Sequence, residues 1–147
     1  MISQTITESL CLFALGILAG AMVYESVVEI GVRKSTNAQE QLHNWQRVYP
    51  VACGLFKPFG TALIPVSIIC GIRSGNWVWY IATIALLILI PFTAIALGNI
   101  NEKLLSCEKI SDEIETKNLI AQWGKFHHVR TTITVFSFAL GVIAFVS

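Results

Sequence analysis

Residues 77–97 read WVWYIATIALLILIPFTAIAL, an apolar run without a single charged side chain. A membrane-spanning α-helix needs about 20 consecutive, mainly apolar residues, so this run is long enough to cross a bilayer. Further apolar stretches of similar length lie at residues 10–32, 51–72 and 126–146. Together these stretches predict an all-α integral membrane protein, and the short chain indicates a single domain over residues 1–147.

The composition of the whole chain agrees with a location in the membrane. Hydrophobic residues make up 54% and charged residues 13% of the 147 positions, whereas soluble domains contain about 25% charged residues. The net charge of +1 comes without a basic tract, so we expect no nucleic-acid partner. The cysteines form no C-x-x-C pair, and we interpret them as small apolar residues: Cys11, Cys53, Cys70 and Cys107.

The connections between the apolar stretches predict an up-down four-helix bundle. Arg73–Asn76 contains Ser74-Gly75, which favours a tight turn. Residues 33–50 form a medium loop, and residues 99–126 form the longest connection. Within the latter, residues 106–120 space apolar side chains among charged ones, which predicts a short amphipathic helix at the membrane surface. Connections of this kind place successive helices antiparallel.

Lysine and arginine residues indicate the orientation of the bundle. They concentrate in the first and third connections, at Arg33, Lys34, Arg47, Lys103, Lys109, Lys117 and Lys125. The opposite side contains only Arg73. Because positively charged loops usually remain in the cytoplasm, we expect both termini outside it. The sequence shows no secretory or organelle signal, so we expect a bacterial inner membrane as the location.

Four charged residues lie inside the apolar stretches at a similar depth. They are Glu25, Glu29, Lys57 and Arg130. Ionisable side chains within a bilayer are costly and often mark function, so a Glu–Lys–Arg network between helices is a candidate site. The alternative is an ion pair that only fixes the register of the helices, with Glu29 reaching the interface.

The last apolar stretch has a polar face. His127, Arg130, Thr131, Thr134 and Ser137 recur at spacings of three and four, which places them on the side of the helix that faces the bundle. His128 points about 100° away from His127, so only one of the two histidines can be central. Such a histidine can act as a base, a metal ligand or a hydrogen-bond donor, or it can merely contact lipid headgroups.

Glycine and proline residues add two expectations about packing. Gly16-x-x-x-Gly20 matches the motif that lets membrane helices approach closely, and it would also allow a homo-oligomer. Pro65 and Pro91 fall within predicted helices, where we expect them to produce kinks.

Four motifs along the chain occur in the order found in one membrane-protein family. They are Gly20-Ala21-Met22; Trp45-x-x-x-Tyr49 followed by Pro58; Pro91-Phe92-Thr93 followed by Asn101 and Leu104-Leu105; and Trp123-x-x-x-His127-x-x-Arg130-Thr131. With this set the chain resembles the family of largely unknown function that includes the fungal anthrone oxygenases. Glu25 and Asn99 depart from the pattern of that family.

The resemblance implies oxidation of an anthrone-type substrate by O₂ without an obvious cofactor. That reaction needs a base, groups that stabilise an oxyanion, and an apolar aromatic slot. His127 or His128 is the expected base, and Arg130 and Asn101 are expected at the oxyanion. The substrate-binding residues expected on the cytoplasmic side are Trp45, Tyr49, Trp123, Glu25 and Lys57. An apolar substrate would enter from the membrane lipid.

Two other functions remain open from the sequence. One is a small-molecule or metal-binding module with ligands among His43, His127, His128 and Glu25, a set that suits zinc, copper or iron. The other is a structural helix bundle that assembles through Gly16 and Gly20.

Overall fold

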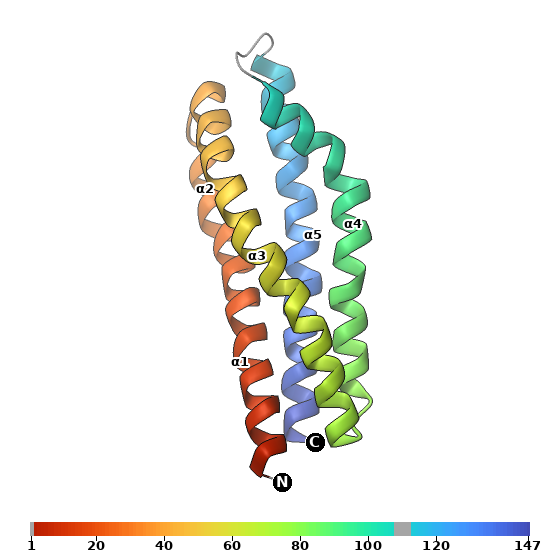
Figure 1. The fold of residues 1–147 in the computed structure, drawn as a ribbon. Coiled ribbons are helices and arrows are strands. Elements are labelled where there is room, and N and C mark those ends of the chain that lie inside the picture. The colour runs from red at the N-terminus through yellow and green to blue at the C-terminus, as the bar shows by residue number, and fades with distance from the viewer. Residues whose placement is uncertain (1, 108–112) are drawn as a thin grey trace.

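The computed structural model describes residues 2–107 and 113–147 as a bundle of long helices (Figure 1). The first long helix is continuous from α1 (Ile2–Tyr24) through a π-helical turn, η1 (Glu25–Glu29), to α2 (Ile30–Arg33). The other long helices are α3 (Ala38–Ser74), α4 (Val78–Ser106) and α5 (Glu113–Val146). In the described part of the chain, 4 helical segments are long and apolar enough to cross a membrane. The protein is therefore an all-α four-helix bundle of the kind predicted.

The helices extend further than the apolar stretches. α3 begins at Ala38, where the Asn37 side chain accepts a hydrogen bond of 2.9 Å from the backbone N–H of Glu40. Residues 38–50 are therefore helix and not loop. Likewise, the separate amphipathic helix expected at residues 106–120 is not found, because residues from Glu113 onward form the first turns of α5. The part of that expectation that covers residues 108–112 lies outside the described residues.

The predicted tight turn joins α3 to α4. Gly75 ends α3 with a φ of 69°, a conformation that favours glycine because it has no Cβ. The Asn76 side chain accepts from the N–H of Val78 and donates at 3.0 Å to the carbonyl of Ala144 near the end of α5. The turn is thereby attached to the C-terminal end of the bundle, which also contains the N-terminus (Figure 1).

The half of the bundle near the termini has an apolar core with polar contacts between helices. The core residues are Cys11, Leu15, Leu18, Met22, Leu63, Cys70, Trp79, Leu86 and Ala144. Ser67 of α3 and Thr83 of α4 share a hydrogen bond of 2.7 Å, and Ser137 of α5 donates to the carbonyl of Ala82. Small hydroxyl residues commonly join membrane helices in this way.

The glycine motif of α1 is divided between two environments. A Cβ on Gly16 would lie 3.3 Å from the ring of Phe138, so this glycine is used for packing against α5. A Cβ on Gly20 would meet nothing within 4 Å, and this residue is exposed. Pro65 and Pro91 lie inside α3 and α4, as the sequence indicated.

Candidate functional site

A second core lies at the opposite end of the bundle, where α2, the start of α3, the end of α4 and the start of α5 meet (Figure 1). Its buried members are Ile30, Leu42, Trp45, Leu97, Ile100, Leu104, Ile120 and Trp123. Gln46 joins α3 to the C-terminus of α4 at this end, since its side chain donates to the carbonyls of Leu104 and Cys107. At this end of the bundle, side chains from α3 and α5 form an aromatic cluster.

Trp123 is the centre of this cluster, which we call the Trp123 cluster and define as Trp45, Tyr49, Trp123 and His127. Trp45 and Tyr49 are stacked on each other with ring centroids 4.5 Å apart, because their i, i+4 spacing places them on one face of α3. Both meet Trp123 edge-on, at 5.9 Å and 6.3 Å. Edge-on packing of this kind suits the quadrupoles of aromatic rings.

His127 lies one turn after Trp123 and is stacked on it, with ring centroids 5.0 Å apart. The side chain is buried, and its Nε2 lies 3.4 Å from the carbonyl oxygen of Met22 on α1. A carbonyl oxygen only accepts, so this contact places a proton on Nε2, and in the neutral imidazole Nδ1 then carries the lone pair. Nδ1 is buried and has no hydrogen-bond partner among the described residues.

Hydroxyl groups form further hydrogen bonds between α5 and the first long helix. The Thr131 hydroxyl lies 3.1 Å from the carbonyl oxygen of Met22 and 2.6 Å from the hydroxyl of Ser26. Ser26 belongs to the π-helical turn η1. Single π-helical turns are rare and occur frequently at functional sites.

Glu25 pairs with Arg33 and not with Lys57. The Arg33 Nη2 donates to Glu25 at 2.6 Å and lies 3.9 Å from a carboxylate oxygen of Glu29. The Arg33 side chain is 5% exposed, and its guanidinium lies 5.7 Å from the centre of the Trp123 ring. Arg33 is therefore part of the site, although the sequence interpretation placed it among the loop charges.

The π-helical turn explains why sequence spacing did not indicate this pair. Eight residues of regular α-helix would rotate Arg33 about 80° away from the direction of Glu25. The wider turn at Glu25–Glu29 accommodates an additional residue and removes much of that rotation. The usable signal was the i, i+4 spacing of Glu29 and Arg33.

The other predicted site residues lie in different surroundings. Asn101 is half-buried and accepts a hydrogen bond of 3.1 Å from the indole N–H of Trp123. Arg130 is half-buried, and its charge acts on Tyr49, Cys53 and Glu25. His128 is exposed on α5, Lys57 is exposed on α3, and His43 is exposed near the start of α3.

Metal-ligand side chains are dispersed in this structure. Within residues 2–107 and 113–147, no group of three or more His, Cys, Asp or Glu side chains could hold a metal ion. The set His43, His127, His128 and Glu25 is therefore not brought together.

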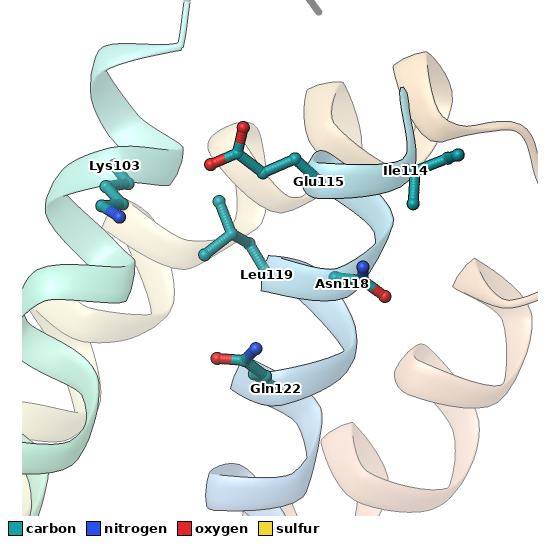
Figure 2. Close-up of a pocket in the computed structure, with 6 residues that line it drawn as sticks. All are labelled: Lys103, Ile114, Glu115, Asn118, Leu119 and Gln122. Carbon is teal, nitrogen blue, oxygen red and sulfur yellow. The ribbon is translucent and has the colours of Figure 1, made fainter. Parts of the chain in front are cut away.

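Two surface grooves lie outside the Trp123 cluster. One, of about 530 Å³, lies between α4 and α5, and Figure 2 shows Glu115 and Leu119 projecting toward the helix that carries Lys103. The other, of about 680 Å³, runs along α3 and is lined by Lys57, Pro58, Thr61, Ala62, Ile64 and Pro65. Of the predicted site residues, only Lys57 lines either groove.

Comparison with known proteins identifies the family. A sequence model of the family described as anthrone oxygenase matches residues 45–140, which is more than half of the chain. No curated protein and no solved structure matched. The match includes all four members of the Trp123 cluster, together with Asn101 and Arg130. The chain therefore belongs to the anthrone oxygenase family.

Proposed function

We propose that this protein oxidises an apolar, anthrone-type substrate with O₂, and that His127 is the base of the reaction. The observation that carries the proposal is the environment of His127. Its Nε2–H is bonded to Met22, its ring is held against Trp123, and its Nδ1 lone pair is buried and free. A neutral imidazole held in one orientation presents this lone pair to a bound substrate as a base.

The chemistry of an anthrone fits such a site. Its central CH₂ group is acidic, because the anion formed on loss of a proton is delocalised over the flanking rings and the carbonyl. The anion passes one electron to O₂, and the resulting radical and superoxide combine to form a peroxide at that carbon. Loss of the remaining C–H proton and cleavage of the O–O bond give the quinone carbonyl and water. Oxygen is reduced, the carbon is oxidised, and no further electron donor is required.

The surrounding residues have supporting roles in this proposal. Trp45, Tyr49 and Trp123 provide flat apolar faces for the rings of the substrate. Asn101 fixes the plane of Trp123, and Arg130 supplies positive charge beside Tyr49. Because Trp45 and Trp123 are buried, a substrate must displace part of the cluster, and half-buried Tyr49 marks the more accessible side.

The membrane location suits the substrate class. A polycyclic phenol or ketone partitions into lipid and can reach the cluster laterally. We propose that the cluster lies on the cytoplasmic side of a bacterial inner membrane, with both termini outside the cytoplasm. The arginine and lysine residues concentrated at that end of the bundle support this orientation.

An assay of anthrone oxidation by membranes that contain the protein tests the proposal. Anthrone consumption and anthraquinone formation would be followed in air and corrected for autoxidation in membranes without the protein. His127→Gln retains a side-chain N–H donor near Met22 but removes the basic lone pair. We expect a loss of rate of about 10²-fold or more for His127→Gln and little change for His128→Gln, whose side chain is exposed.

The outcomes separate the possible functions. A wild-type rate equal to background would refute the oxygenase proposal. Loss of rate in His128→Gln but not in His127→Gln would refute the choice of base.

A further inference from the structure

Three side chains beside Trp123 have buried nitrogen atoms with no hydrogen-bond partner among the residues that the structure describes. They are Nε and Nη1 of Arg33, Nε1 of Trp45 and Nδ1 of His127. A buried donor or acceptor without a partner is costly, and native proteins contain few of them. Among the described residues the one other side chain of this kind is Trp79, in the core near the termini, so these groups concentrate around one indole ring, where a bound ligand would supply the missing partners.

The surroundings of Arg33 fix its guanidinium without using most of its N–H groups. Nη2 is bonded to Glu25, and the guanidinium lies over the ring of Trp123. The whole residue is 4% exposed, so water reaches it little. A cationic donor that is already oriented and dehydrated binds an acceptor oxygen more strongly than the same group in water.

The free groups form a pattern of N–H donors from two side chains and one acceptor from a third. Arg33 and Trp45 present N–H groups, and His127 presents a lone pair. An aromatic molecule with an oxygen acceptor and an acidic hydrogen has the complementary pattern. The charges near the cluster are two carboxylates and two guanidinium groups, which balance: Glu25, Glu29, Arg33 and Arg130. A neutral ketone or phenol therefore fits this site without carrying a charge.

We propose that Arg33 and the indole N–H of Trp45 bind the carbonyl or phenolic oxygen of a planar aromatic ligand, while Nδ1 of His127 faces its acidic hydrogen. This inference rests on the proposed function for the identity of the ring system. It makes Arg33 the residue that stabilises the oxyanion, a role that the family resemblance had implied for Arg130 and Asn101. Arg33 precedes residues 45–140, so the family match does not include it.

Equilibrium binding to the purified full-length protein in detergent tests the assignment without turnover. One probe is a dihydroxyanthraquinone, whose central carbons already carry oxygen and cannot be oxidised again. The second probe is anthracene, which has the same three rings and no oxygen. Affinities would be measured from the absorbance or fluorescence change of each probe.

The variants are chosen so that no buried charge is left alone. Arg33→Met combined with Glu25→Gln removes both members of the ion pair, since deletion of one member would leave an uncompensated charge. Trp45→Phe retains the ring and removes the N–H group. Arg47→Met, at an exposed position of α3 between Trp45 and Tyr49, is the control for loss of a cationic side chain.

We expect the double variant to bind the dihydroxyanthraquinone about 10- to 100-fold more weakly, as loss of a charge-assisted hydrogen bond predicts. Trp45→Phe should weaken it several-fold, and Arg47→Met should not change it. Anthracene should bind all four proteins alike.

Three results would overturn the assignment: no binding of the quinone by the wild type, an unchanged affinity in the double variant, or an equal loss for both probes. Quinone binding with the expected selectivity but no anthrone oxidation would refute the proposed function and leave the oxygen-binding site intact. Anthrone oxidation with equal loss of binding for both probes would refute the oxygen-binding site and leave the proposed function intact.

Discussion

The Arg33–Glu25 ion pair gives a prediction about stability that follows directly from its burial. Arg33→Met leaves the Glu25 carboxylate without its partner at 2.6 Å. Removal of one member of a buried ion pair costs about 3–5 kcal/mol, and because the Glu25 side chain is still 17% exposed we expect the lower end, about 3 kcal/mol. Arg33→Met combined with Glu25→Gln removes both charges and should lie within about 1 kcal/mol of the wild type.

Reversible unfolding in mixed micelles, followed by tryptophan fluorescence at increasing SDS, measures this difference. The single variant, the double variant and the wild type would be compared at one detergent composition. If Arg33→Met costs less than about 1 kcal/mol, the pair is not buried as described. If the double variant is as unstable as the single one, Arg33 stabilises the bundle by packing and the electrostatic argument is wrong.

Three further predictions concern packing, the Trp123 cluster and orientation. Gly141→Val should lower the free energy of unfolding by about 1–3 kcal/mol, because a Cβ there would lie 3.2 Å from the side chain of Leu15. Gly20→Ala should change the free energy of unfolding by less than about 0.5 kcal/mol in the same SDS titration, because a Cβ there meets nothing within 4 Å. Trp123→Phe should lower the free energy of unfolding by about 1 kcal/mol, because it removes the hydrogen bond to Asn101, and it should also lower anthrone turnover. If neither quantity changes, this ring does not have the proposed role. In intact cells an impermeant maleimide should label Ser147→Cys and not Lys34→Cys, and the reverse would invert the proposed topology.

The fold could be predicted because apolar length and one glycine turn determine it. Four stretches of spanning length and the Ser74-Gly75 signal are enough to define an up-down bundle. The helix ends could not be predicted in the same way. Residues 38–50 are polar and look like a loop, but a helix leaving the membrane satisfies its own backbone hydrogen bonds and can continue into water.

The candidate site was only partly visible in the sequence. The family resemblance named Trp45, Tyr49, Trp123 and His127 as expected site residues, but residues 33–50 were expected to be a loop, so the stacking of Trp45 on Tyr49 along α3 was not predicted. Lys57 was expected beside Glu25 because both lie at a similar depth, yet Lys57 is exposed on α3. Depth is readable from a sequence, whereas the rotation of a helix about its axis depends on packing. Arg33 was missed for a related reason, since a π-helical turn changes the rotation between it and Glu25.

The central claim is that His127 removes the proton that starts an oxidation by O₂. Purified wild-type protein and His127→Gln in proteoliposomes would be given anthrone under ¹⁸O₂, and labelled anthraquinone would be quantified by mass spectrometry after subtraction of protein-free autoxidation. The account predicts that the wild type forms anthraquinone carrying one atom of the label and that His127→Gln falls close to the autoxidation rate. Equal rates of labelled product in the two proteins, or product without the label, would contradict it.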